Sequence, residues 1–184
     1  MMFNPLNIQL LNRVKAYHSI VIFGHTSPDG DCFSCQSSLK QFIKENFPDK
    51  EVYVTGSGFK KALPYFGEMD IVSDEIISNS LGIVVDVSDL GRIEDQRVVN
   101  CKEIVKFDHH INSDREGFAS VNIADISAGS CAEVIGKFIL DNGYEISKDV
   151  GERLYLGITT DTGRFLYLNK DADSFIVADK ILKS

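Results

Sequence analysis

The apolar residues of this chain fall in short runs, rich in β-branched side chains, that alternate with longer segments of helical period. This alternation is typical of an α/β domain, because helices connect the parallel strands and cover the sheet. The run at 82–85 is apolar on both faces, as a central strand between two helical layers should be. We predict six strands, at 19–24, 52–55, 69–73, 82–87, 102–107 and 119–123.

Several segments between these runs have the apolar spacing and the end signals of helices. Apolar residues recur on one face after Asp31, and Pro48 lies just beyond the end of the pattern. Ser130 and Glu133 form a capping-box pattern, and Gly143 ends the helix that they begin. Further helices are expected close to the N-terminus, at 148–160 and at 171–182. The predicted fold is a doubly wound α/β domain with a mostly parallel sheet covered by helices on both faces.

Length, composition and charge narrow the function classes. With 184 residues, 43% of them hydrophobic, the chain can bury a core, and no repeat or Pro- or Ser-rich linker divides it. Its formal net charge is −8 and no run of Lys or Arg exceeds two residues, so it lacks the basic track that grips long nucleic acid. We therefore expect one domain and no long duplex as a partner.

The chain shows no sign of a membrane span or a secretion signal. No stretch approaches the roughly 18 uninterrupted apolar residues that cross a bilayer, and Asn and Gln interrupt the N-terminal segment. A cytoplasmic protein is expected. Its four cysteines are expected to be small buried thiols, since a zinc site through Cys32 and Cys35 would lack a second ligand pair.

Acidic residues and histidines gather directly after predicted strands. Three such groups follow one another along the chain: His25 with Asp29 and Asp31, then Asp86, then Asp108 with His109 and His110. The carboxyl ends of parallel strands meet at one edge of a sheet, which predicts that these groups lie together. Several carboxylates at such short range repel one another, and bound divalent cations would relieve that repulsion.

Each group also has an interpretation without a metal. Asp86 alone fits a carboxylate that caps a loop, and His25 alone fits a hydrogen-bonded core histidine. The adjacent pair His109 and His110 after an acidic residue suits neither a core nor an ordinary turn. Oxygen and imidazole donors without a thiolate favour Mn²⁺, with Mg²⁺ or Co²⁺ as alternatives and iron and zinc left open.

Four segments resemble, in order, the four motifs of the DHH phosphoesterases: His25-Thr26-Ser27-Pro28-Asp29-Gly30-Asp31, the isolated Asp86, Asp108-His109-His110, and the segment 157–165, which reads GITTDTGRF. The segment 127–133 resembles a further element of one subgroup, the bacterial oligoribonucleases, or nanoRNases, that also act as pAp phosphatases. The resemblance extends from about residue 19 to residue 165. It implies a DHH-type doubly wound domain.

The resemblance also implies roles for individual residues. It implies two divalent metal ions, one held by His25 and Asp29, the other held by Asp31, His109 and Asp161, and both bridged by Asp86. Asp108 would orient His109 from behind, and His110 would face the substrate phosphate. Arg164, in the fourth motif, would contact the substrate, although an arginine after a glycine is often only a solvated surface charge.

The chain departs from the family pattern at two places. The first motif of the family continues with Ala, any residue, Gly and Ser, whereas this chain has Cys32-Phe33-Ser34-Cys35. None of these four is an expected metal ligand, but the extra bulk of Ser34 is expected to alter substrate access. The family's second, smaller domain has no counterpart after Leu168, so residues 1–184 are interpreted as a single DHH catalytic domain.

The expected function is hydrolysis of short oligonucleotides or 3′,5′-bisphosphorylated nucleosides by a metal-activated water. One alternative is a pyrophosphatase, polyphosphatase or cyclic-dinucleotide phosphodiesterase, which the same metal centre would serve. Another is a non-catalytic module that binds metal and nucleotide. The helix that begins near Ser130 either adds N–H donors to the phosphate or is only a capped helix. A homodimer is left open.

Overall fold

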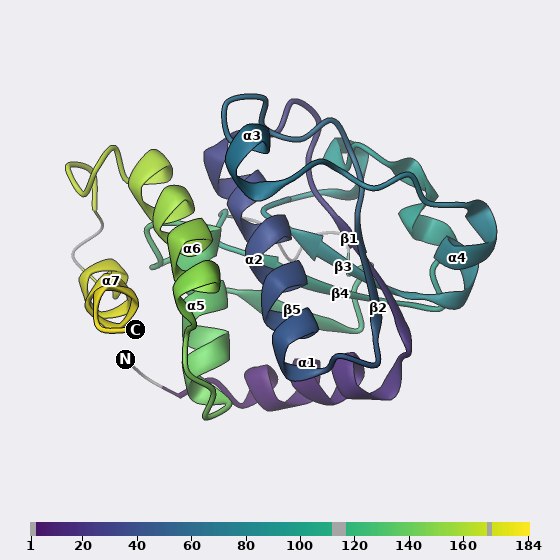
Figure 1. Cartoon of the computed structure of the whole chain (residues 1–184), viewed down its shortest axis with the longest axis horizontal. Coiled ribbons are helices and arrows are strands. Elements are labelled where there is room, and N and C mark those ends of the chain that lie inside the picture. Colours follow the sequence, from purple (N-terminus) through teal and green to yellow (C-terminus); the bar gives the residue numbers. More distant parts are fainter. Residues whose placement is uncertain (1–2, 112–116, 169–170) are drawn as a thin grey trace.

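A computed structural model describes residues 3–111, 117–168 and 171–184 (Figure 1). Its centre is a sheet of five parallel strands in the order β2-β1-β3-β4-β5. The strands are β1 (Ser19–Phe23), β2 (Glu51–Val54), β3 (Leu81–Val85), β4 (Glu103–Asp108) and β5 (Val121–Ala124). The chain passes from β1 to β2 on one side and then to β3 on the other. The carboxyl ends of β1 and β3 therefore lie at the switch point where such sheets bind ligands.

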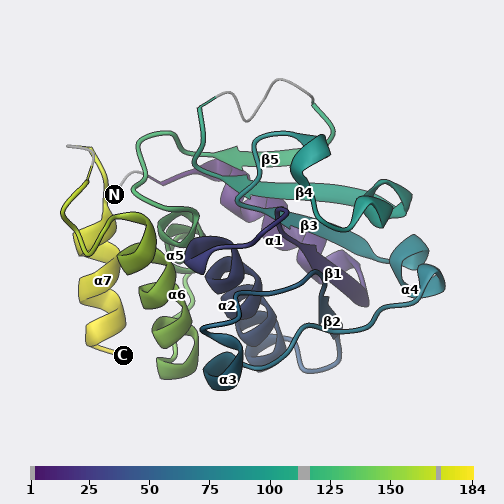
Figure 2. The same ribbon diagram turned by 90° about the horizontal axis from the view of Figure 1, so that it is seen from above.

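Helices cover one face of the sheet in two layers. They are α1 (Pro5–Ala16), α2 (Gly30–Asn46), α5 (Cys131–Asp141), α6 (Lys148–Asp161) and α7 (Ser174–Leu182). In Figure 2, α2, α5 and α6 lie on the same side of the sheet, and α7 lies outside α6. The larger core lies between these helices and the strands, where Phe138 contacts Phe42 and Phe107 edge to face.

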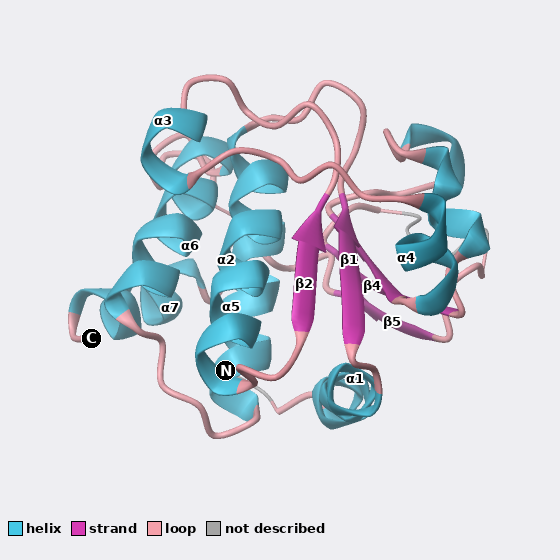
Figure 3. Cartoon of the chain, turned by 45° about the vertical axis from the view of Figure 1, so that its right-hand side comes forward, coloured by secondary structure: helices cyan, strands magenta, loops and turns pink. Residues whose placement is uncertain are grey.

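The opposite face carries shorter elements, as Figure 3 shows, with α4 (Asp74–Asn79) across the sheet from α2. Two 3₁₀ turns lie there, Leu90–Arg92 and Gln96–Asn100, and Ile93, directly after the first, and Val98, within the second, belong to a second, smaller core. The predicted α/β class and the helical cover on both faces are therefore confirmed. Among the described residues, no helix is long and apolar enough to cross a membrane.

Helices α2 and α6 approach each other closely, and this contact explains the unusual Ser34. Its hydroxyl accepts a 3.0 Å hydrogen bond from the N–H of Gly157 and donates to the carbonyl of Arg153. A Cβ on Gly157 would lie 2.8 Å from the Ser34 Oγ, so only glycine fits there. Ser34 is fully buried in this helix interface. The expectation that its bulk alters substrate access is therefore wrong.

The strand predicted at 69–73 is also wrong, although the segment runs beside β2. The N–H of Asp70 donates to the carbonyl of Val54, but the N–H of Val54 donates to the carboxylate of Asp70 at 2.7 Å. A side chain thus takes the place of the next ladder bond, and no strand forms. Val72 is buried in the second core, which accounts for the apolar pattern.

The remaining strands and the predicted helices are present, with ends displaced by up to three residues. The helix α3 (Leu63–Phe66) and α4 were not predicted, since both are too short for a helical period to show. Three of the four cysteines are buried and Cys101 is partly buried, and all four are free thiols.

Candidate metal centre

The candidate metal centre lies at the carboxyl ends of β1, β3 and β4. His25 follows β1 after one glycine, and Asp86 directly follows β3. The N–H of Asp86 donates to the carbonyl of Phe107 on β4. Asp86 has a φ of 59°, a left-handed conformation that non-glycine residues seldom adopt and that proteins retain mainly at functional sites.

The carboxylate of Asp86 lies between two histidines. Its Oδ2 is 3.5 Å from the Nε2 of His25, and its Oδ1 is 3.5 Å from the Nε2 of His109. The side chain is almost completely buried, and Oδ1 has no hydrogen-bond partner among the described residues. A buried, unpaired carboxylate oxygen is costly unless a proton or a cation meets it. Asp86 therefore has the geometry of a bridge between two cations.

The ring of His25 is oriented by its own loop. Its Nδ1 is 2.9 Å from the carbonyl of Thr26, which can only accept, so Nδ1 carries the proton of that hydrogen bond. Nε2 faces Asp86 and Asp29, the latter at 3.8 Å, and is the nitrogen that would bind a cation once it has lost its proton. Metal-binding histidines commonly have such a hydrogen bond at the other nitrogen.

A second group surrounds His109. The Nε2 of His109 is 3.4 Å from Asp161, the last residue of α6, and 4.0 Å from Asp31 on α2. Ligand atoms of these three residues all lie within 4.8 Å of one another. Contact between α2 and α6 thus brings together carboxylates that are 130 positions apart in the sequence.

Asp31 also occupies the N-terminus of α5. Its two carboxylate oxygens accept hydrogen bonds from the N–H groups of Cys131 and Ala132, at 2.7 and 3.0 Å. The Oγ of Ser130 accepts from the N–H of Glu133. The first N–H donors of this helix therefore hold a protein carboxylate and a cap, and they do not point freely at a substrate phosphate.

Asp29 is the expected ligand that fits least well. One of its oxygens caps α2 by accepting from the N–H groups of Asp31 and Cys32, and its side chain is 59% exposed. The thiol of Cys32 lies instead within 4.8 Å of ligand atoms of His25 and Asp86, and it accepts from the N–H of His25. Burial raises the pKa of this thiol to about 11. Cys32 was not expected near the metal, since the sequence showed only a small thiol.

Asp108 differs from its expected role. Its Oδ1 accepts a 2.7 Å hydrogen bond from the Nδ1 of His110. From His109 the same oxygen accepts a hydrogen bond of the backbone N–H and not of the ring. Its Oδ2 lies 3.3 Å from the Nζ of Lys106, and both side chains are buried. The carboxylate thus orients the ring of His110 instead of the ring of His109, and the buried lysine balances its charge.

The pKa directions show a site that retains protons when no cation is bound. Burial and the nearby Asp86 and Asp161 raise the pKa of Asp31, and burial raises that of Asp161. Burial opposes protonation of His109, but Asp86 and the other carboxylates raise its pKa to about 9. Divalent cations can replace these protons, because the donors are oxygen and imidazole atoms on several sides of one space. The residues present therefore fit divalent metal ions.

An open cavity of about 590 Å³ adjoins this cluster. His109, His110 and Asp161 are among the residues that line it. Arg92, for which the sequence predicted no role in the site, also lines the cavity. Arg164 is exposed and is not among the described residues that line it. Arg92 follows Asp86 by only six positions, which was the one indication in the sequence that it lies near the site. The local sequence pattern does not show toward which part of the fold its side chain points.

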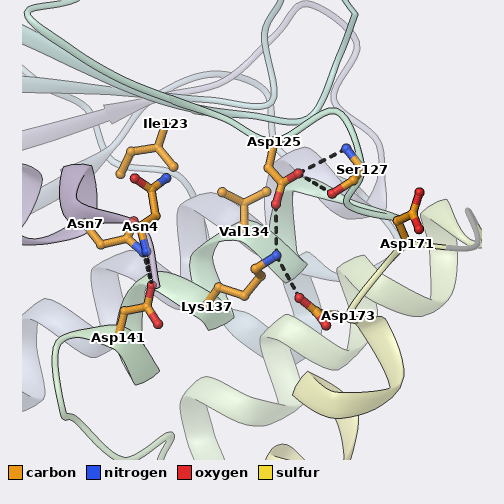
Figure 4. Close-up of a pocket in the computed structure, with 10 residues that line it drawn as sticks. All are labelled: Asn4, Asn7, Ile123, Asp125, Ser127, Val134, Lys137, Asp141, Asp171 and Asp173. Atoms are coloured by element: carbon orange, nitrogen blue, oxygen red, sulfur yellow. Dashed lines mark hydrogen bonds and ion pairs between the residues drawn. The ribbon is translucent and has the colours of Figure 1, made fainter. Parts of the chain in front are cut away.

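A second cavity, of about 460 Å³, is lined by four aspartates and one lysine (Figure 4). The Nζ of Lys137 lies 2.9 Å from Asp125 and 3.0 Å from Asp173. The cation is thus already paired, and a phosphate would meet excess negative charge. The cavity beside the two histidines is the better site for a phosphorylated ligand.

Comparison with known proteins agrees with this geometry. The N-terminal domain of the DHH family matches residues 19–158. A Streptococcus mutans protein, named as a probable bifunctional oligoribonuclease and PAP phosphatase NrnA, is 40% identical over 95% of this chain and 55% of its own length. The Bacillus subtilis bifunctional oligoribonuclease and PAP phosphatase NrnA is 29% identical over 97% of this chain and 57% of its own.

The fold is similar to that of a crystal structure of an exopolyphosphatase-related protein from Bacteroides fragilis, with a TM-score of 0.83 and 25% identity. That match covers 97% of this chain and 56% of the other. The chain spans little more than half the length of these relatives. Because the match to the family's N-terminal domain covers most of the chain, this protein belongs to the DHH family.

Proposed function

We propose that this chain is the metal-binding part of a phosphoesterase that hydrolyses short oligonucleotides and 3′,5′-bisphosphorylated nucleosides. One observation carries the proposal: a buried, unpaired oxygen of Asp86 faces His109 while the other oxygen faces His25. Such an arrangement suits two neighbouring cations that share one carboxylate. The site opens into a cavity that holds His110.

The proposed ligands follow from the two groups. One ion would be held by His25, Asp29 and Asp86, with Cys32 close by, and the other by Asp31, Asp86, His109 and Asp161. When bound, the ions would supply an activated water and neutralise charge on the phosphoryl oxygens. Mn²⁺ is the expected metal, because the donors are mainly oxygen and imidazole, and Mg²⁺ or Co²⁺ are alternatives.

His110 is the proposed contact to the scissile phosphate. Its Nδ1 donates to Asp108, so Nε2 is the nitrogen left for a ligand in the cavity, and it can donate a hydrogen bond there when the ring is positively charged. The hydrogen bond to Asp108 raises the pKa of His110, which favours the positively charged ring. A charged donor at this position would stabilise negative charge that develops on the phosphoryl oxygens. Contact between Arg164 and substrate stays a prediction.

The substrate class rests on the relatives and on charge. The Streptococcus mutans relative is named as a probable bifunctional oligoribonuclease and PAP phosphatase, and the Bacillus subtilis relative as a bifunctional oligoribonuclease and PAP phosphatase. A net charge of −8 without a basic track favours a short substrate over a long strand. A cytoplasmic location and a homodimer stay predictions.

The decisive experiment is a phosphate-release assay with Mn²⁺ over a panel of substrates. The panel contains a 3′,5′-bisphosphorylated nucleoside, a dinucleotide, a long oligomer, pyrophosphate and a cyclic dinucleotide. Turnover of the first two, lost in His110→Asn and kept in the exposed variant Asp49→Asn, would support the proposal. Faster turnover of pyrophosphate or of the long oligomer would contradict the substrate class. Nucleotide binding without any turnover would identify a non-catalytic module.

A further inference from the structure

Besides proposed metal ligands, the 590 Å³ cavity is lined by an arginine, Arg92, and an aromatic residue, Tyr167. Arg92 is exposed, and Tyr167 is 80% exposed. The cavity is also lined by Ile111 and Ile126, which are 74% and 63% exposed. A cation beside a surface of exposed apolar and aromatic side chains is a combination that suits a ligand with both a phosphate and a flat ring.

The backbone of Arg92 is fixed relative to the metal centre. Its carbonyl accepts a 2.8 Å hydrogen bond from the N–H of Thr26, and Ile93 forms an antiparallel bridge with His25. The 3₁₀ turn Leu90–Arg92 is therefore joined to the loop that carries a proposed ligand. The guanidinium of Arg92 forms no ion pair or hydrogen bond within the described part of the chain. It remains available to a ligand anion.

Among the described residues that line this cavity, Arg92 is the one permanent cation. The cavity also holds Asp161, so a polyanion needs positive charge from elsewhere. The metal centre and His110 would neutralise the scissile phosphate. Arg92 forms no ion pair with the described carboxylates of that centre, which leaves its charge for a further phosphate group. A guanidinium suits this task because it binds two phosphate oxygens at once.

Tyr167 is held beside the same cavity by the turn that follows α6. Its N–H donates to the carbonyl of Thr162, and its ring packs on Gly163, where a Cβ would lie 2.5 Å from the ring. Gly163 has a φ of 56°, so glycine suits this turn for its backbone as well. The ring thus contacts this turn and is otherwise largely exposed. Exposed aromatic rings in this setting bind nucleobases by stacking.

We propose that Arg92 and Tyr167 form a nucleotide subsite, in which Arg92 binds the phosphate that is not cleaved and Tyr167 stacks on the adjoining base. This inference rests on the proposed function and adds the substrate feature that the cavity selects. The selected class is a nucleotide with one phosphate beyond the scissile one. Pyrophosphate, which lacks a base, would use only part of the subsite.

Equilibrium binding tests the subsite independently of turnover. Titration calorimetry would measure the Kd of a non-hydrolysable phosphorothioate analogue of a 3′,5′-bisphosphorylated nucleoside, with Mn²⁺ present. Arg92→Gln should raise the Kd about 10–100-fold, the usual effect of losing a charge-assisted hydrogen bond. Tyr167→Ala should raise it about tenfold and Tyr167→Phe should not, because stacking needs only the ring.

Matched controls come from the same chain. Arg13→Gln removes a partly exposed arginine of α1, and Tyr65→Ala removes a tyrosine of α3 that is also 80% exposed. Both should leave the Kd unchanged. Two nucleoside monophosphates serve as further ligands, each lacking one of the two phosphates. For the monophosphate that retains only the scissile phosphate, Arg92→Gln should change the Kd less than threefold.

The outcomes separate the two proposals. If wild type binds and hydrolyses nucleotides while Arg92→Gln and Tyr167→Ala match their controls, the subsite is wrong and the proposed function stands. If wild type neither binds nor hydrolyses any nucleotide, both proposals fail. An equal loss of affinity for bisphosphate and monophosphates in Arg92→Gln would also overturn the assignment, because Arg92 would then serve the scissile group.

Discussion

The carboxylate of Asp86 lies 3.5 Å from the Nε2 of His109, on a residue whose backbone is in the left-handed region. Asp86 directly follows β3, whereas His109 follows β4. The neighbouring, parallel pairing of β3 and β4 brings them together. The metal centre is thus a product of strand order as much as of the residues themselves.

Asp86→Asn should reduce the number of Mn²⁺ ions bound per chain from two to one or none. An amide supplies one weaker oxygen donor and no charge between the two histidines, so it bridges cations poorly. Titration with detection of free Mn²⁺ by electron paramagnetic resonance would measure this, with Asp49→Asn as the matched control. Two sites of unchanged affinity would contradict the bridging role.

Lys106→Met should lower the free energy of unfolding by about 3–5 kcal/mol, because it leaves the buried carboxylate of Asp108 without its counter-charge. Urea unfolding measures the change. The double variant, Lys106→Met with Asp108→Asn, should lose less unfolding free energy than the two single variants lose together. Lys40→Met, at the more exposed pair with Asp70, should cost about 1 kcal/mol or less. Equal losses at both lysines would refute this account.

The sheet could be predicted from the sequence because strand runs such as 82–87 carry their signal locally. The strand predicted at 69–73 could not be corrected locally, since the carboxylate of Asp70 takes the N–H of Val54 only in the folded chain. An apolar residue such as Val72 reports burial, and burial alone does not distinguish a strand from an extended loop.

The candidate site, like the fold, was predictable from the sequence only in part. That acidic residues at strand ends would gather was predictable, because parallel topology alone requires it. The partner of Asp108 was not, since the choice between the rings of His109 and His110 depends on the turn after β4. Arg92 was missed because its hydrogen bond to Thr26 joins two loops that the sequence separates.

Gly157→Ala should destabilise the fold by about 1–3 kcal/mol, as overpacking of a tight core does. The added Cβ would lie 2.6 Å from a carboxylate oxygen of Asp31 and 2.7 Å from the Cβ of Ala132. Because Asp31 is a proposed ligand, Mn²⁺ binding should weaken as well. Gly91→Ala is the control, since its Cβ would meet nothing closer than 3.4 Å. Thermal unfolding and Mn²⁺ titration of both variants would test the argument, which fails if the two behave alike.

The stability of the metal-free chain should fall as the pH rises from 6.5 to 9. Asp86 and its neighbours raise the pKa of His109 to about 9, whereas the unfolded chain has the ordinary value near 6.5. The folded state thus binds a proton more tightly, and the stability that this gives is complete below about pH 6.5 and lost as the pH approaches 9. His25, whose pKa is raised by hydrogen bonds to Asp29 and then Asp86, acts in the same direction.

Thermal unfolding in a chelator would measure this fall, at about 2–4 °C per kcal/mol for a domain of this size. Anaerobic samples loaded with Mn²⁺ should show a smaller fall or a rise, because the ions replace the protons and bind better once these are lost. His109→Asn removes one titrating group, so its metal-free melting temperature should depend less on pH than that of wild type. A metal-free wild type whose melting temperature is constant or rises over this range would show that His109 is not held in its charged form by the surrounding carboxylates.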